Sequence, residues 1–324
     1  MRNTCLRGNT CLRTFLVYLA IGFARLLAWM PPAAVHAIGA GFGYLGWWLN
    51  GRRTKISRTN IQLCYPQLSD GDRESLVKQS MIETGKTLFE VGMLWFWPLE
   101  KVDRLITRVT GMEYLQRAID ENQGVILILP HHGTWEILTH FLRHQSYACV
   151  IMYKPAKIKA LNRWICRSRS RVRAGLIPAS ITGIKTLHRI LKEKAIVAIF
   201  PDQDPGSRSG VFAPFFGEPA WTGRLINSLA RAHPAALLSM YARRIGSGDY
   251  EIIIKPASEM IRDKDPVVAA TAVNASIEEC VNECPSMYQW SYARFKTRPE
   301  GKEKLYRFKR KQRKARKARA HIVT

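Results

Sequence analysis

The 324-residue sequence lacks several features that would place it quickly in a functional class. Its seven cysteines are scattered and form no C-x-x-C pair, so the chain offers no zinc ribbon or dithiol redox motif. It has no uninterrupted run of about 20 apolar residues, the length that a membrane-spanning helix needs, which argues against a multi-span membrane protein. It has no internal repeat, and its 47% hydrophobic and 23% charged residues are typical of a folded globular chain.

Acidic residues are also scarce. The chain has 25 Asp and Glu against 50 Lys and Arg, a formal net charge of +25. No acid lies between Glu136 and Glu193, a stretch with 12 Lys and Arg, and residues 302–319 carry 11 Lys and Arg with one acid. Such a field attracts anionic lipid, phosphorylated substrates, nucleic acid or an acidic carrier protein. We predict that 301–324 is a basic, disordered tail and that the acid-free segment meets an anionic ligand.

The N-terminal 50 residues are predicted to anchor the chain to a membrane. Residues 15–30 are almost wholly apolar but number only 16 and include Arg25, and a second apolar stretch at 33–49 ends in two tryptophans. Aromatic residues followed by the cations at 52–58 are typical of an interface anchor on the cytoplasmic side. A short single span and a helix lying in the interface both remain open, and no clear cleavage site supports a signal peptide.

The remainder, residues 51–300, predicts an α/β fold with a mixed, mainly parallel sheet flanked by helices. Buried strands are expected at 124–129, 148–153, 195–200, 236–241 and 251–254. Helices are expected at 70–95 after the cap Ser69, at 134–145, 157–173, 180–192 and 222–231, and from Asp265-Pro266 onward. Alternating strands and helices are typical of this fold class.

A histidine and a carboxylate follow the first buried strand, where open α/β sheets bind ligands. His131 comes directly after the strand and Glu136 lies five residues later. Such a pair suits general-base catalysis, with the carboxylate orienting the imidazole. Since no G-x-S-x-G turn supplies an enzyme nucleophile, we expect the attacking hydroxyl to belong to the substrate.

Two other interpretations of this block stay open. His132, Glu136, His140 and His144 recur every four residues and would form a stripe of metal-ligand types on one helix face, although a stripe of four is too long for one ion. A histidine after a strand is also often an ordinary, hydrogen-bonded structural residue.

Several blocks, in the same order, resemble the lipid A late acyltransferases of Gram-negative bacteria. His131-x4-Glu136 resembles the H-x4-(D/E) motif of glycerolipid-type acyltransferases, and PHHGTWE at 130–136 resembles the family block GHxGNWE. The other blocks are RTNIQLCYPQLS at 58–69, similar to RxNLxLCFPxLS; YKP at 153–155, similar to YRP; PDQD at 201–204; and VFAPFFG at 211–217, similar to VFVPFFG. With Arg243-Arg244 and residues 288–299, the resemblance spans about residues 15 to 300.

The resemblance implies transfer of a fatty acyl chain from acyl-carrier protein to a hydroxyacyl chain of a lipid A precursor. It places the enzyme at the cytoplasmic face of the bacterial inner membrane and calls for no cofactor or metal ion. It makes His131 the general base and Glu136 its partner. The substrate-binding residues that it implies are Arg169, Lys154, Asp202, Arg208 and Arg243.

This sequence departs from the family blocks at four positions. Lys154 replaces an arginine, so a bidentate phosphate contact becomes a point charge. His132 replaces an apolar or aromatic residue, Thr134 replaces an asparagine, and Pro205 interrupts the loop after PDQD. The His/Glu pair is kept, but another glycolipid or a lysophospholipid remains an alternative acceptor.

Two functions from other classes also remain open. The charge and the tail fit a nucleic-acid-binding protein, but no RNP1 block, zinc knuckle or clear helix-turn-helix is present, and we predict no nucleic-acid partner. Asp202 and Asp204 have the D-x-D spacing of a metal-dependent glycosyltransferase, a function that would leave the His/Glu block idle.

Overall fold

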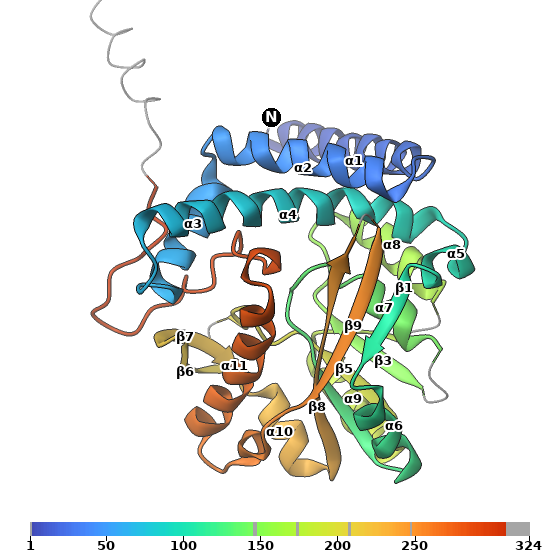
Figure 1. Ribbon diagram of the computed structural model, residues 1–324, viewed down its shortest axis with the longest axis vertical. Coiled ribbons are helices and arrows are strands. Elements are labelled where there is room, and N and C mark those ends of the chain that lie inside the picture. The colour runs from blue at the N-terminus through green and yellow to red at the C-terminus, as the bar shows by residue number, and fades with distance from the viewer. Residues whose placement is uncertain (1, 145–147, 173–174, 207–208, 247, 309–324) are drawn as a thin grey trace, which may run out of the picture.

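The computed structural model describes residues 2–144, 148–172, 175–206, 209–246 and 248–308 (Figure 1). The helices are α1 (Arg2–Leu27), α2 (Pro32–Trp48), α3 (Arg52–Cys64), α4 (Asp70–Phe96), α5 (Leu99–Asp103), α6 (Met112–Asp120), α7 (Ile137–Leu142), α8 (Lys159–Ser170), α9 (Ile181–Lys192), α10 (Leu225–Ala232) and α11 (Pro266–Glu283), with 3-10 turns η1 (Glu259–Arg262) and η2 (Pro285–Met287). The strands are β1 (Ile106–Thr110), β2 (Gly124–Ile128), β3 (Cys149–Tyr153), β4 (Gly175–Pro178), β5 (Ile196–Ile199), β6 (Gly210–Phe215), β7 (Glu218–Gly223), β8 (Ala235–Ile245) and β9 (Asp249–Pro256).

The main sheet has the strand order β1-β9-β8-β2-β5-β3-β4. Its last five strands in that order run parallel to one another, whereas β9 is antiparallel to β8 and β1 is parallel to β9. The predicted α/β class with a mixed, mainly parallel sheet is therefore confirmed. Strands β6 and β7 form a separate antiparallel hairpin beside α11 (Figure 1).

Strand β2 lies near the centre of the sheet and is buried along its whole length. Val125 and Leu127 face one core, which α4, α6 and α7 cover, while Ile126 and Ile128 face a second core under α9, α10 and α11. This alternation follows from the two-residue period of a strand. An apolar run without polar interruption is what a strand covered on both faces requires.

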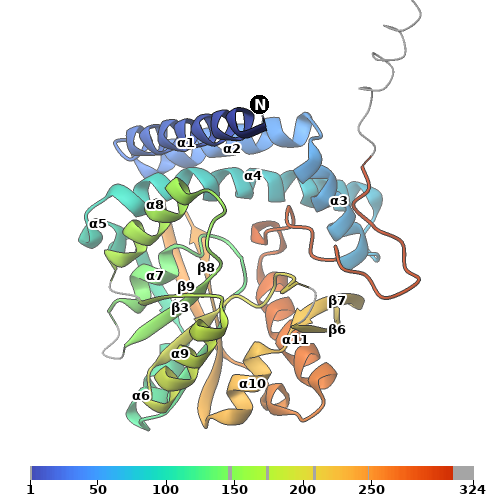
Figure 2. The same ribbon diagram turned by 180° about the vertical axis from the view of Figure 1, so that it is seen from behind.

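The N-terminal helices α1 and α2 lie together across α4, at one end of the molecule (Figures 1 and 2). The backbones of α2 and α4 are in direct contact, and only glycine permits this approach. A Cβ on Gly43 would lie 2.3 Å from the Met81 oxygen, and a Cβ on Gly85 would lie 2.1 Å from the Gly39 oxygen. No helix within the described residues is long and apolar enough to cross a membrane. The predicted attachment of residues 1–50 to a membrane therefore stays a prediction.

Most expected elements are present. The two predicted caps, Ser69 and Asp265, are confirmed, and Ser180 also caps a helix. The side chains of Ser69, Ser180 and Asp265 accept hydrogen bonds from the first turns of α4, α9 and α11. Strands β1, β4, β6 and β7 were not expected from the apolar pattern, because polar residues stand in β1 and β7 and because β4 and β6 contain glycine and proline. The basic tail lies outside the described residues from 309 onward.

The expected helix at 134–145 starts later, at Ile137. The preceding loop takes another course, since Gly133 has φ +55° and its N–H donates to the carbonyl of Met287 over 2.9 Å. A Cβ on Gly133 would lie 2.2 Å from the Ala242 oxygen, so the close approach requires glycine here. Glu136 is consequently the residue that begins α7 rather than one within it.

Candidate active site

Two neighbouring parallel strands bring the central residues together. His131 follows β2 and Asp202 follows β5, and these strands pair in parallel, so their carboxyl ends share one edge of the sheet. Nδ1 of His131 lies 2.7 Å from Oδ1 of Asp202, and the backbone N–H of His131 donates to Oδ2 over 2.8 Å. One carboxylate thus fixes both the backbone and the ring of His131.

The sequence predicted Glu136, not Asp202, as the partner of this ring, and the structure corrects that pairing. Asp202 was also predicted to bind substrate, but both its oxygens are engaged by His131 and the residue is buried. The same contacts remove it from a free D-x-D metal pair with Asp204. The error arose because Asp202 lies 71 residues from His131, and only the β2–β5 pairing makes them neighbours.

Asp202 is held in its charged form despite its burial. Burial alone would raise the pKa of this carboxyl, but the His131 ring and the hydrogen bonds that His131 donates outweigh it and lower the pKa below the usual value. A charged carboxylate at Nδ1 favours a proton on that nitrogen, which leaves Nε2 with a free lone pair.

The His131 ring is also fixed by packing. Its centroid lies 4.7 Å from that of Phe200 and 5.3 Å from that of Trp135. Nε2 lies 3.4 Å from the amide nitrogen of Gln203, which in turn donates to Oε1 of Gln289. The imidazole is one-fifth exposed, so Nε2 remains open to a ligand in the adjoining cavity.

Glu136 has a different partner. Its carboxylate pairs with the guanidinium of Arg169 on α8 through two hydrogen bonds, one of them 3.2 Å long from Nε. Both side chains are largely buried, and Arg169 lines the same cavity as His131. Glu136 therefore fixes an arginine at the site, as a bidentate carboxylate partner does.

A buried ion cluster holds the loop between His131 and Glu136. Thr134 donates to the carboxylate of Glu90 on α4 and accepts a 2.7 Å hydrogen bond from Arg244 on β8. Arg244 also pairs with Glu90 at 2.6 Å and with Glu83, and His36 on α2 lies 2.8 Å from Glu90. Glu90 is fully buried, yet Arg244, His36 and Thr134 lower its pKa against the effect of burial.

The histidine stripe that suggested a metal site does not form. His132 lies in the loop before α7, where its Nε2 is 2.9 Å from the Cys284 carbonyl oxygen, and burial lowers its pKa to about 4. His140 and His144 instead lie beside Asp103, at 3.8 and 3.0 Å. The stripe required a helix from 132 onward, and the helix begins at Ile137.

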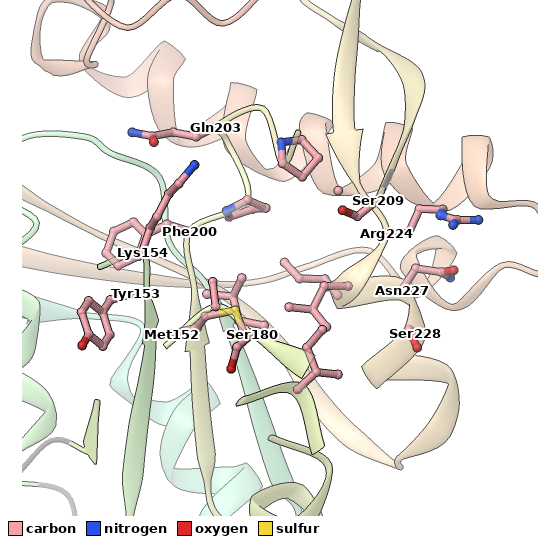
Figure 3. A pocket seen from close by; sticks show the side chains of 18 of the residues that line it. Met152, Tyr153, Lys154, Ser180, Phe200, Gln203, Ser209, Arg224, Asn227 and Ser228 are labelled. Atoms are coloured by element: carbon pink, nitrogen blue, oxygen red, sulfur yellow. The ribbon is translucent and has the colours of Figure 1, made fainter. Parts of the chain in front are cut away.

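A cavity of about 1390 Å³ opens at the carboxyl ends of β2, β3 and β5. Figure 3 shows Lys154 and Gln203 on one side of it, Arg224, Asn227 and Ser228 on the other, and aliphatic side chains between them. Its lining includes five cations, namely Lys154, Arg169, Arg224, Arg231 and Lys264, but one acid, Asp204. The site therefore combines a histidine base with an apolar, positively charged cavity.

The structure gives different outcomes for the other predicted substrate-binding residues. Lys154 and Arg169 line the cavity with His131. Arg243 does not line it, because its guanidinium pairs with Glu251 on the adjacent strand β9 at 2.8 Å. Arg208 lies outside the described residues. Sequence reasoning missed Arg224, Arg231 and Lys264, although the spacing of polar residues along 224–231 was a signal for a helix face turned toward a ligand.

The chain was compared with protein families and with curated proteins. A family model of bacterial lipid A biosynthesis acyltransferases matches residues 7–297. The chain belongs to this family. The lipid A biosynthesis lauroyltransferase of Escherichia coli (strain K12) is 31% identical over 296 residues, which cover 91% of this chain and 95% of the relative. The palmitoleoyltransferase of the same strain is 30% identical over the same shares of both chains, and its myristoyltransferase is 23% identical over 90% of each.

Proposed function

We propose that this acyltransferase moves a fatty acyl chain from acyl-carrier protein to a hydroxyacyl chain of a lipid A precursor. The observation that carries the proposal is the His131–Asp202 pair, with Nε2 facing a large cavity that is apolar in part and positively charged. Among the described residues, no serine or cysteine is hydrogen-bonded to His131, so the acceptor hydroxyl is the nucleophile. Family membership supports the substrate class.

In the proposed step, His131 acts as the general base. The acceptor hydroxyl oxygen attacks the carbonyl carbon of the acyl thioester, and its proton passes to Nε2. The new C–O bond forms as the C–S bond breaks, and the proton then passes from Nε2 to the departing thiolate. Asp202 keeps Nδ1 protonated and stabilises the imidazolium that forms between the two transfers.

Arg169 and Lys154 supply positive charge at this end of the cavity. Glu136 engages two nitrogens of Arg169 and holds its guanidinium in place, so the remaining N–H groups are positioned to donate to the oxyanion of the tetrahedral intermediate. Lys154 is exposed and makes no ion pair within the described residues, which leaves it free for an anionic group of a substrate. Glu136 thus contributes through the arginine that it positions.

The acid-free segment offers a docking surface for the acidic donor protein. Helices α8 and α9 lie within it and border the cavity through Ile165, Arg169, Ile181 and Ile184. Their exposed cations include Arg163, Arg167 and Lys185. Charge complementarity of this kind steers association and depends on salt.

The α1–α2 layer is the surface proposed to rest on the membrane. Apolar side chains remain exposed along both helices, namely Phe15, Leu16, Tyr18, Leu19, Phe23, Leu26, Trp29, Phe42, Tyr44, Leu45, Trp48 and Leu49. Leu26 is 65% and Trp29 86% exposed, which is unfavourable in water and suits a lipid interface. We place this surface on the cytoplasmic face of the inner membrane. Sedimentation with anionic vesicles should fall when both residues become serine, and unchanged sedimentation would contradict the assignment.

The function is tested by incubating the purified full-length chain with acyl-carrier protein loaded with a fatty acid and with a lipid A precursor that has a free hydroxyacyl chain. Mass spectrometry should find a product heavier by one acyl group. Release of free fatty acid without that product would show hydrolysis and would overturn the proposed transfer. Replacing the acceptor by a lysophospholipid or another glycolipid tests the alternative acceptors directly.

A further inference from the structure

The side of the cavity away from His131 carries a second group of cations that the proposed chemistry does not use. Ser228 and Arg231 of α10 line it, together with Arg224, the N-cap residue of that helix, and Lys264 from the segment between η1 and α11. Figure 3 places Arg224 and Ser228 across the cavity from Gln203, the residue that contacts His131. We name these four residues the α10 cluster.

Helix α10 presents two distinct faces. Arg224, Asn227, Ser228 and Arg231 recur at spacings of three, four and seven residues and all line the cavity. The opposite face, with Leu229 and Ala230, is buried in the second core. The α10 cluster is thus on a helix that the core fixes in place, with its polar stripe toward the cavity.

The segment that carries Lys264 is tied to α10 by buried hydrogen bonds. The amide of Asn227 donates to the carbonyls of Ile261 and Asp263, at 2.8 and 3.0 Å. The guanidinium of Arg262 donates to carbonyls at the end of α10, among them that of His233 at 3.1 Å. The two segments that carry the three cations are therefore hydrogen-bonded to each other in the absence of a ligand.

These cations differ from the other arginines of the site in having no carboxylate. Arg169, Arg243 and Arg244 each pair with a glutamate, whereas no ion pair within the described residues involves Arg224, Arg231 or Lys264. The nearby carboxylates of Asp263 and Asp265 accept backbone N–H bonds at the start of α11 and do not line the cavity. Like charges gathered without counter-charges repel one another, so the arrangement favours a bound anion.

We propose that the α10 cluster binds a phosphate monoester on the acceptor lipid. Two guanidinium groups, an ammonium and the Ser228 hydroxyl suit the oxygens of a phosphate. The lining between the cluster and His131 is apolar, with Met152, Ile184, Ile199 and Ile226 among its residues, so the ligand is an amphiphile whose phosphate and reacting hydroxyl lie apart. The inference rests on the proposed function and adds to it the group that sets acceptor selectivity.

The test compares the acceptor with the same lipid after removal of its phosphates. The Arg224→Gln/Arg231→Gln variant should raise KM for the phosphorylated acceptor about tenfold or more, the loss expected for charged hydrogen bonds. It should leave kcat and the KM for the acyl donor within about twofold. On the dephosphorylated acceptor, the variant and the wild type should behave alike. The control is Arg117→Gln, which changes an exposed arginine on α6 outside the cavity. It should leave kcat and the KM values for both acceptors and for the acyl donor unchanged.

Three results would overturn the inference. The variant could lose the same factor on both acceptors, or show no loss on either. It could instead raise only the KM for the donor, which would assign the cluster to the acidic carrier protein. Equilibrium binding of the two lipids, measured calorimetrically in detergent, separates this inference from the proposed function: without any acyl transfer, tighter binding of the phosphorylated lipid that depends on Arg224 and Arg231 still supports the cluster.

Discussion

The two sides of the cavity differ in whether their charged groups form ion pairs. Around His131 nearly every charged group has a partner: Asp202 holds the ring, Glu136 holds Arg169, and Arg244 is buried with two glutamates. Along α10 the cations are exposed and have no carboxylate within the described residues. Paired charges fix geometry, whereas unpaired charges attract ligands, so chemistry and recruitment are separated within one cavity.

The largest effect is expected on stability, at the most deeply buried ion pairs of the molecule, those of Arg244. Arg244→Ala would leave Glu83 and Glu90 buried without their counter-charge and should lower the free energy of unfolding by about 3–5 kcal/mol. Arg189→Ala is the control, because its ion pair with Glu193 is more than half exposed on both sides. That control should cost below about 1 kcal/mol. Urea unfolding in detergent measures both, and equal losses would refute the distinction.

The next effect is on the chemistry. His131→Ala should lower kcat roughly 100-fold or more, the usual scale of general-base catalysis, while the protein stays folded. His144→Ala, an exposed histidine beside Asp103, should retain normal turnover and serves as the control. Steady-state assays on both variants, with circular dichroism as the folding check, decide the point. A His131→Ala variant that keeps wild-type turnover would remove the proposed step.

Asp202→Asn removes the charge of the ring's partner while keeping its size. Turnover should fall roughly tenfold to 100-fold, since the ring loses the group that sets its tautomer and stabilises its protonated form. The pH–rate profile should shift as well, because the imidazolium is less stable without the carboxylate. A loss of stability with an unchanged kcat and an unchanged profile would give Asp202 a purely structural role.

The smallest effect expected is a change in pH dependence. His132 is buried and neutral, with a pKa of about 4, whereas in the unfolded chain it titrates near 6.5. Between these values the unfolded state binds more protons, so the free energy of unfolding should fall as the pH drops from about 6.5 to about 4. His140 acts in the same direction. His132→Gln should therefore reduce this pH dependence without abolishing it, and an unchanged slope from unfolding curves would contradict the assignment.

Much of the fold could be predicted because the apolar pattern is strong. Runs such as 124–129 and 195–200 required strands buried on both faces, and Ser69, Ser180 and Asp265 marked helix starts correctly. Strands β6 and β7 were missed because both contain proline and glycine, which are uncommon in strands, and β7 also contains polar residues. Their turn, with positive φ at Phe216 and Gly217, was the available signal.

The site was harder to predict than the fold. The position of His131 follows from one strand, and its place at the cavity agrees with the general rule for parallel sheets. Its carboxylate partner depends on which strands pair, and a motif read along the chain favoured Glu136, the nearer residue. The α10 cluster depends on how a helix packs, because burial of Leu229 and Ala230 in the second core turns its cationic face toward the cavity.

In the proposed function, His131 is the general base for acylation of a lipid A precursor. This role is tested most directly by mass spectrometry of lipid A from cells that lack the gene and carry either the wild-type chain or the His131→Ala variant. The wild-type chain should restore one secondary acyl group, and the variant, present at equal amount, should restore none. An identical acylation pattern with both chains would contradict the account.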